Sequence, residues 1–356
     1  MTANGKVLFR VDADHRIGLG HLQRSLSLAA ALRASGTESV FFGLADEHSG
    51  ERVRGAGFPV STLPAVDPWS SDDVSATLAA AKDHGCEAVV VDSHELGADY
   101  LALLRSGGLY VIARDDLALF PFPCQVVVNG NADAPQLPYR STSGDTAFLL
   151  GPRYIVLGSD YQDNPPSAAA GDSVSNVLVI LGGTDHYGLM PKILSSLAEA
   201  PGGFSVTAVI GPYFRNVPAV ESAAEQAGRQ ITLVHSPDSV QQYMLQADLA
   251  ISAAGQALYE LAATACPTVA IQIASNQAGQ MRAMEQAQAV RVAGNAEIED
   301  VIPRLTAAVS ALIFDLEARV SLGAAGRRLV DGQGAVRVAQ AVRAALNCGI
   351  GKATSI

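Results

Sequence analysis

The strongest constraint on the fold of this chain is an alternation of short apolar runs with helical patterns. In the first half, residues 87–92 form a continuous apolar run that ends on a carboxylate. The runs 109–113 and 125–128 are followed by Arg114-Asp115-Asp116 and by Asn129-Gly130-Asn131. Apolar runs of this length are typical of parallel strands buried on both faces. Strands that alternate with helices and end on polar residues predict a doubly wound α/β domain.

The same alternation restarts at residue 176, after a polar, proline-containing stretch that reads as a linker. A chain of 356 residues suits two domains of about 150–180 residues better than one core. We therefore predict an α/β protein with two Rossmann-like doubly wound domains that face a central cleft. The predicted parts are an N-terminal domain 1–161, a linker 162–175, a C-terminal domain 176–325, and a C-terminal helix and tail 326–356. The alanine-rich pattern 319–346 is long enough to cross back to the first domain.

The composition of the chain argues against some classes of binding partner. The net charge is −11, and no basic run occurs in the sequence, which argues against a nucleic-acid partner. No apolar run reaches the ~20 residues of a membrane span, and the N-terminus lacks the apolar core of a signal peptide. We expect a cytoplasmic protein with no membrane span. The four cysteines show no C-x-x-C spacing, so we expect reduced, buried thiols and no metal site.

The first candidate site follows the β-rich run 6–10. A loop with Gly18 and Gly20 leads into a helical pattern that opens with His21 and carries Arg24 one turn later. A strand, a glycine turn and a helix can bring backbone amides, a base and a cation to one anion. The spacing does not fit the dinucleotide pattern G-x-G-x-x-G. The glycines can equally form a plain turn, and His21 can be a helix-start residue bonded within its own turn.

A second group of candidates lies in the second half. The sequences Gly182-Gly183-Thr184-Asp185 and Gly255-Gln256 each follow a predicted strand and open a predicted helix, where amides can bind a diphosphate. Glu260 lies about one helical turn further on, where a carboxylate can accept hydrogen bonds from ribose hydroxyls. Its alternative role is to stabilise the helix dipole. Asn276 and Gln277 follow another predicted strand. Their side-chain amides can bind a ligand, or the two residues can simply form a turn.

These motifs, taken in order, resemble one family. The chain is similar over roughly residues 6–290 to the UDP-sugar hydrolases of pseudaminic acid biosynthesis and their spore-coat polysaccharide relatives. Those enzymes in turn resemble inverting, MurG-like glycosyltransferases of the GT-B type. The residues that carry the resemblance are Arg10-x-Asp12, Gly18-x-Gly20-His21-x-x-Arg24, Asp115-Asp116-Leu117-Ala118, Asn129-Gly130-Asn131, Gly151-Pro152-x-Tyr154, Leu181-Gly182-Gly183-Thr184-Asp185, Gly255 with Glu260, and Asn276-Gln277.

The resemblance implies that UDP binds to the C-terminal domain and that the sugar faces the N-terminal one. His21 matches the family's catalytic base, which activates water to break the anomeric C–O bond with inversion, and Glu260 matches its nucleotide-contacting acid. No metal or cofactor is implied, and the partner is a UDP-linked amino- or deoxy-sugar, of the 2,4-diacetamido-2,4,6-trideoxy-hexose type. Motifs and resemblance together predict substrate-binding residues at Asp12, Gly18, Gly20, Arg24, Gly182, Gly183, Thr184, Gly255, Gln256, Glu260, Asn276 and Gln277. Two alternatives remain open, a glycosyltransferase that uses a UDP-sugar donor and a non-catalytic nucleotide-sugar binder.

Three positions depart from the family pattern. Gly158 stands where the hydrolases carry an arginine that contacts the sugar nucleotide, and a hydrogen cannot replace a guanidinium. His94 replaces a tyrosine expected at the sugar-facing edge, and Gln256 replaces the usual Ser or Thr. We still expect the protein to bind UDP. The sequence does not identify the sugar, the acceptor or the oligomeric state.

Overall fold

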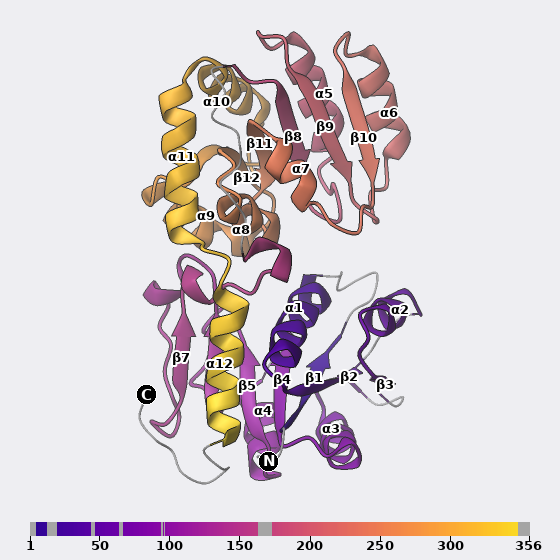
Figure 1. Ribbon diagram of the computed structural model, residues 1–356, viewed down its shortest axis with the longest axis vertical. Coiled ribbons are helices and arrows are strands. Elements are labelled where there is room, and N and C mark those ends of the chain that lie inside the picture. The colour runs from indigo at the N-terminus through magenta and orange to yellow at the C-terminus, as the bar shows by residue number, and fades with distance from the viewer. Residues whose placement is uncertain are drawn as a thin grey trace. The chain divides into compact units, whose positions relative to one another are not determined.

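The computed structural model describes residues 5–12, 20–43, 47–63, 67–93, 95, 97–162 and 173–347. Gly18, His94, Cys348 and most of the expected linker lie outside these residues. The chain divides into two compact units (Figure 1). Unit 1 comprises Met1–Ser159 together with Gln333–Ile356, and unit 2 comprises Asp160–Gly332.

Unit 1 is built on a seven-stranded sheet in the order β3-β2-β1-β4-β5-β6-β7, and every strand pair is parallel. The strands are β1 Lys6–Val11, β2 Glu38–Gly43, β3 Val60–Thr62, β4 Ala88–Asp92, β5 Tyr110–Arg114, β6 Val126–Asn129 and β7 Ala147–Leu150. The helices are α1 Gly20–Ala34, α2 Glu47–Gly55, α3 Ser71–His84, α4 Ala98–Ser106 and α12 Gly334–Asn347. Separate apolar clusters pack on the two faces of this sheet.

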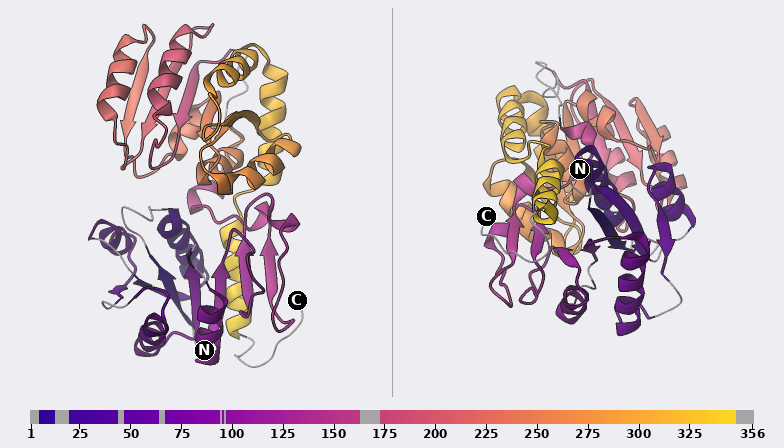
Figure 2. Two further views of the ribbon diagram at one scale, coloured as in Figure 1. Left: turned by 180° about the vertical axis from the view of Figure 1, so that it is seen from behind. Right: turned by 60° about the horizontal axis from the view of Figure 1, so that its bottom comes forward.

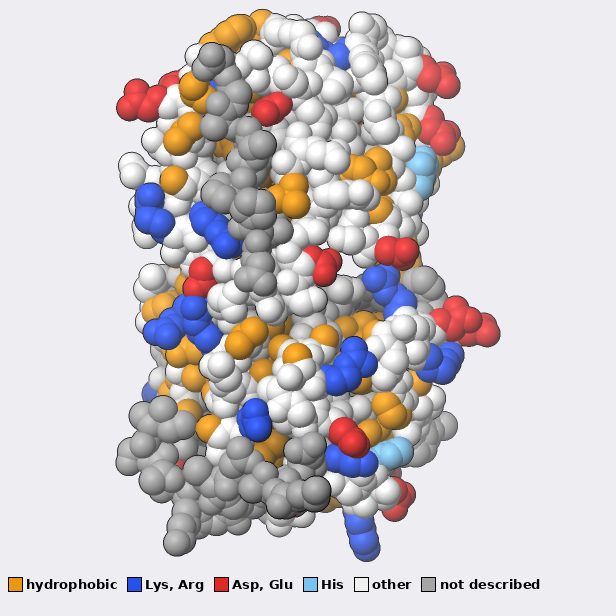
Figure 3. Space-filling model, in the orientation of Figure 1, with side chains coloured by type: hydrophobic (Ala, Val, Ile, Leu, Met, Phe, Trp, Pro, Cys, Tyr) orange, Lys and Arg blue, Asp and Glu red, His pale blue; other side chains and the backbone are white. Residues whose placement is uncertain are grey.

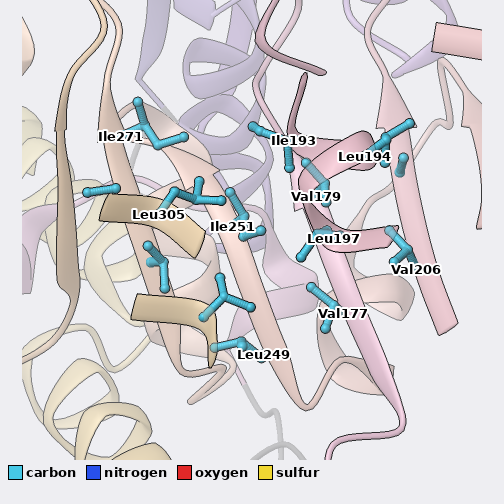
Figure 4. Packing of buried hydrophobic residues seen from close by; sticks show 14 of the residues in the cluster. Val177, Val179, Ile193, Leu194, Leu197, Val206, Leu249, Ile251, Ile271 and Leu305 are labelled. Carbon is cyan, nitrogen blue, oxygen red and sulfur yellow. The ribbon is translucent and has the colours of Figure 1, made fainter. Parts of the chain in front are cut away.

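Unit 2 repeats the design with a six-stranded parallel sheet in the order β10-β9-β8-β11-β12-β13. The strands are β8 Asn176–Ile180, β9 Ser205–Ile210, β10 Ile231–His235, β11 Leu249–Ala253, β12 Thr268–Gln272 and β13 Arg291–Asn295. The helices are α5 Leu189–Glu199, α6 Val217–Gln226, α7 Gln241–Gln246, α8 Gln256–Ala263, α9 Ala278–Gln286, α10 Ile302–Phe314 and α11 Leu316–Leu329. Val177 and Val179 of β8 meet Ile193 and Leu197 of α5 in its core (Figure 4).

Both sheets confirm the predicted Rossmann-like class. In each sheet the strand order reverses between two adjacent strands, β1 and β4 in unit 1, and β8 and β11 in unit 2. Ligands of open α/β sheets bind at the carboxyl ends of the strands beside such a reversal. The fold therefore marks one candidate edge in each unit.

The C-terminal region differs from its sequence pattern. Residues 319–346 read as one helical stretch, but the structure contains two helices, α11 in unit 2 and α12 in unit 1. Gly332 between them has φ +78°, and a Cβ at this position would lie 2.0 Å from the carbonyl oxygen of Tyr161. The position therefore requires a glycine. Beyond it α12, the yellow helix of unit 1 in Figure 2, packs against α1. Its residues Val338 and Val342 join the apolar cluster of unit 1.

Candidate functional site

In unit 1 the reversal of strand order brings α1 against the end of β4. Gly20, the first residue of α1, is exposed, whereas His21 is 8% exposed. The Nδ1 atom of His21 lies 3.8 Å from Oδ1 of Asp92, the last residue of β4. Since 3.8 Å exceeds hydrogen-bond length, the contact is an electrostatic pairing of imidazole and carboxylate. An imidazole next to a carboxylate, as in a base and its orienting acid, thus lies at this edge.

Arg24 holds the carboxylate in place from the same helix. Its Nε donates to Oδ2 of Asp92 at 2.8 Å, and its Nη2 donates to Oδ1. Its Nη1 donates to Asp116 at 3.0 Å. Burial alone would raise the pKa of Asp92, but the charges of Arg24 and His21 hold that pKa well below its usual range. Two carboxylates therefore engage the Arg24 guanidinium inside unit 1, and these bonds fix the position of the Asp92 carboxylate; the predicted role of Arg24 in substrate binding stays a prediction.

The ends of β5 and β6 carry a connected polar network. Oδ2 of Asp115 accepts hydrogen bonds from two backbone amides of its own turn and, at 2.6 Å, from the hydroxyl of Tyr139. Asn129 donates to the Tyr139 hydroxyl, and Asn131 donates to Asp116. The two family-like motifs Asp115-Asp116 and Asn129-Gly130-Asn131 are therefore one network, and it shapes the rim beside the candidate base.

Asp12 lies in a different, fully buried arrangement. Oδ1 of Asp12 is 2.5 Å from Nη1 of Arg10, and Arg10 also donates to both carboxylate oxygens of Asp73. The guanidinium stacks on the ring of Trp69 at 4.2 Å. With 2% exposure, Asp12 anchors the end of β1 through an ion pair. Its sequence-based role as a substrate ligand stays a prediction.

In unit 2 the loop after β8 is the first part of the candidate nucleotide site. Gly182, Gly183 and Thr184 are exposed, and Gly182 has φ +88°. The helix begins later than its motif indicates, at Leu189, and both oxygens of the Asp185 carboxylate accept its first backbone amides, at 2.7 and 2.8 Å. The first two amides of helix α5 are thus bound by Asp185, which leaves the amides of the glycine loop as the candidates for binding an anion.

Gly211 lies in close contact with the glycine loop, a contact that the sequence motifs did not indicate. A Cβ at Gly211 would lie 2.4 Å from the carbonyl oxygen of Gly182 and 2.5 Å from that of Gly183. The end of β9 therefore approaches the glycine loop too closely for any side chain. The sequence does place Gly211 directly after a predicted strand. A glycine in that place is equally typical of an ordinary turn, so the sequence alone does not predict the contact.

Gly255 precedes the first turn of α8 at the end of β11, next to β8 in the sheet. Gln256 begins the helix, and Glu260 lies on its second turn, half-buried. Oε2 of Glu260 accepts a hydrogen bond from the Tyr161 hydroxyl at 3.3 Å. Burial raises the pKa of Glu260 to about 7, while the bond from Tyr161 opposes that rise. Tyr161 was missed because it borders a stretch that reads as linker.

Asn276 and Gln277 follow β12 and form a short 3₁₀ turn. Asn276 is exposed, whereas Oε1 of Gln277 accepts the backbone amide of Ile273 at 3.0 Å. The Nε2 atom of Gln277 lies 3.8 Å from the place of a Cβ on Gly255. The turn after β12 therefore reaches the start of α8, and unit 2 gathers its predicted residues along one edge of the sheet.

The remaining surface gives few signs of another chemistry. On the face drawn in Figure 3, the coloured Lys and Arg side chains are scattered among acidic ones without forming a continuous basic surface. Within the described parts of the chain, no group of His, Cys, Asp and Glu has a metal-binding arrangement. The helices there are too short or too polar to cross a membrane. Cys86, Cys124 and Cys266 are buried free thiols.

Two Rossmann-like units in one chain have the GT-B type of fold. The structure matches MurG from Acinetobacter baumannii with a TM-score of 0.71 at 12% identity, over 96% of this chain and 99% of that one. It also matches HepE from Anabaena in complex with UDP and glucose, with a TM-score of 0.62 at 14% identity over 96% and 99%. At these identities the matches show the fold.

Sequence comparisons identify relatives that are more similar to this chain than the matched structures are. The chain is 28% identical over 199 residues to the spore coat polysaccharide biosynthesis protein SpsG of Bacillus subtilis, covering 55% of this chain and 58% of SpsG. It is 24% identical over 196 residues to the UDP-2,4-diacetamido-2,4,6-trideoxy-beta-L-altropyranose hydrolase of Campylobacter jejuni, covering 54% of this chain and 66% of the hydrolase. The matches thus span less than two thirds of each relative's length. No family model matches the sequence. The resemblance to the SpsG-like and UDP-sugar-hydrolase-like group with a MurG-like fold is confirmed.

Proposed function

We propose that this protein is a UDP-sugar hydrolase in which His21 is the general base. The observation that carries the proposal is the pairing of His21 with Asp92 at the strand reversal of unit 1, with Nδ1 and Oδ1 3.8 Å apart. A buried carboxylate next to an imidazole stabilises the protonated ring that forms when a base accepts a proton. The C. jejuni relative, a hydrolase by name, supports the same chemistry.

The proposed reaction is a single displacement. A water molecule loses a proton to His21 while its oxygen bonds to the anomeric carbon, and the bond from that carbon to the UDP oxygen breaks. Configuration at the carbon inverts, and UDP leaves as a stable anion that needs electrostatic stabilisation but no proton donor. Imidazole is the side chain best suited to accept such a proton near neutral pH.

The proposed nucleotide site lies in unit 2. The amides of Gly182, Gly183 and Thr184 and the first turn of α8 after Gly255 would bind the diphosphate. The Glu260 carboxylate would accept hydrogen bonds from the ribose hydroxyls. Gln256, Asn276 and Gln277 would complete this edge of unit 2. In unit 1, Asp12, Gly20 and Arg24 remain the proposed substrate-binding residues.

Release of UDP from a UDP-sugar, in water labelled with ¹⁸O and without an acceptor, tests the proposal. Label on the sugar supports cleavage of the anomeric C–O bond, whereas label on the phosphate would exclude it. His21→Asn should abolish release while leaving the affinity for UDP unchanged. His235→Asn, a change at an exposed histidine at the end of β10, is the matched control and should leave both unchanged.

A glycosyltransferase is the second candidate, favoured by the structural likeness to MurG. In that reaction His21 would take the proton from an acceptor hydroxyl instead of from water. Slow UDP release that accelerates at least tenfold when an acceptor sugar is added would favour transfer over hydrolysis.

A further inference from the structure

Gln280, on α9, carries a buried side-chain amide that joins two neighbouring elements of unit 2. The residue is 7% exposed. Its Nε2 atom donates a hydrogen bond to the backbone carbonyl of Ala254, the residue directly after β11. Its Oε1 atom accepts, at 2.9 Å, a hydrogen bond from the hydroxyl of Tyr259 on α8, and Tyr259 is 1% exposed. The side chain of Gln280 therefore fixes the end of β11 and the helix that follows it.

The bond to Ala254 also determines the direction of the next backbone amide. No peptide bond in the described chain is cis, and in a planar trans peptide the carbonyl and the N–H group point in opposite directions. Since the carbonyl of Ala254 points to the buried Gln280, the N–H group of Gly255 points away from it. Gly255 is half-buried, and its N–H group has no hydrogen-bond partner among the described residues. The amide that precedes α8 is thus held as an unused donor.

A second unused donor lies next to this amide. Oε1 of Gln277 accepts the backbone amide of Ile273 at 3.0 Å, which leaves the Nε2 atom of the same side chain as a donor. This Nε2 atom lies 3.8 Å from the place of a Cβ on Gly255. The start of α8 has no side-chain cap in the described structure. Two neighbouring N–H donors at the positive end of a helix suit an anion.

We propose that Gln280 is a positioning residue for diphosphate binding. It holds the carbonyl of Ala254 inward, so that the N–H group of Gly255 is oriented towards a phosphate oxygen before the ligand arrives. The inference rests on the proposed function and adds to it a residue that acts without touching the ligand. The position needs a side chain that donates to a carbonyl and accepts from a hydroxyl at once, and the amide of glutamine does both. A peptide turned the other way would present its carbonyl oxygen to the diphosphate and repel it.

The test separates positioning from a purely structural role. Gln280→Met keeps an unbranched side chain but can no longer donate to Ala254. Affinities for UDP and for uridine, which lacks both phosphates, are measured by titrating ¹⁵N-labelled protein and following its amide resonances. Gln280→Met should weaken UDP binding roughly tenfold and leave uridine binding unchanged. UDP should shift the Gly255 amide resonance of the wild-type protein, and the variant should lose most of that shift.

Two controls accompany this variant. Tyr259→Phe removes the other bond of Gln280 and leaves the carbonyl of Ala254 bound, so it should keep the preference for UDP over uridine. Gln286→Met, at an exposed glutamine at the end of α9, should change neither affinity. If Gln280→Met does not fold because the Tyr259 hydroxyl loses its acceptor, Gln280→Met with Tyr259→Phe removes that hydroxyl too. The double variant is then compared with Tyr259→Phe alone.

Each other outcome is decisive. Equal losses for UDP and uridine in Gln280→Met, or no loss for either, would overturn the positioning role and leave the proposed function standing. A Gly255 resonance that UDP leaves unshifted in the wild-type protein would do the same, even where uridine binds too weakly to measure. A loss of preference in Tyr259→Phe as large as in Gln280→Met would assign the effect to α8 instead of the carbonyl. Failure of the wild-type protein to bind UDP would overturn the proposed function itself.

Discussion

The hydroxyl group of Tyr161 donates a hydrogen bond to the carboxylate of Glu260, 3.3 Å from oxygen to oxygen. Tyr161 is 5% exposed and lies at the start of unit 2, whereas Glu260 lies on α8, 99 residues later. The bond stabilises the charged form of a carboxylate that burial would keep protonated. Tyr161 therefore favours the charged form of Glu260, the proposed acceptor for the ribose hydroxyls.

The affinity for UDP should depend on pH through Glu260. The pKa of Glu260 is about 7, so the carboxylate is mostly neutral below that pH and mostly charged above it. Since the charged form is the stronger acceptor for ribose hydroxyls, affinity should rise as pH increases through 7. Calorimetric titrations with UDP between pH 5.5 and 8.5 measure this rise. A flat profile would remove Glu260 from the nucleotide site.

Tyr161→Phe should shift that profile to higher pH. Without the phenolic donor, burial acts on Glu260 unopposed, so its pKa rises and affinity at pH 7 falls. Tyr110→Phe, at the start of β5 in unit 1, serves as control and should leave the profile in place. Glu260→Ala should weaken UDP binding by roughly 1–3 kcal/mol at pH 8 and abolish the pH dependence.

Asp92→Asn should destabilise unit 1 strongly. The change leaves Arg24 and Arg114 buried with one compensating charge fewer, which costs about 3–5 kcal/mol in comparable buried pairs. Asp145→Asn removes a carboxylate from a partly exposed pair with Arg105 and should cost about 1 kcal/mol or less. Urea unfolding of both variants measures the difference. Similar losses in the two would contradict the buried network.

The Asp92 carboxylate should also affect how the stability of the protein changes in acid. Because the pKa of Asp92 in the folded protein lies below that of an unfolded aspartate, its contribution to the free energy of unfolding is complete above the unfolded value of ~3.9. The contribution is lost as pH falls below that value towards the folded pKa. Asp92→Asn should therefore flatten the loss of stability between about pH 5 and pH 2, measured by urea unfolding at each pH.

Gly211→Ala should disturb the glycine loop of unit 2. Its Cβ would meet the carbonyl oxygens of Gly182 and Gly183 at 2.4 and 2.5 Å, so the loop must move. We expect a loss of stability of about 1–3 kcal/mol and weaker UDP binding. Gly203→Ala is the control, because its Cβ would meet nothing within 4 Å. Unchanged UDP affinity in Gly211→Ala would exclude the loop from the nucleotide site.

The sequence by itself determined the class of fold, because buried parallel strands require apolar runs whose length and spacing are written in the chain. It also indicated the main candidates at the edges of the sheets, His21 and Glu260 among them, since polar residues after a parallel strand lie at its functional edge. Only the tertiary structure decided which groups pair. Arg24 reads as a free cation in sequence, yet hydrogen bonds join it to Asp92 at the end of β4 and to Asp116 in the turn after β5. Such pairings join residues dozens of positions apart, and local patterns contain no information about which strand ends become neighbours.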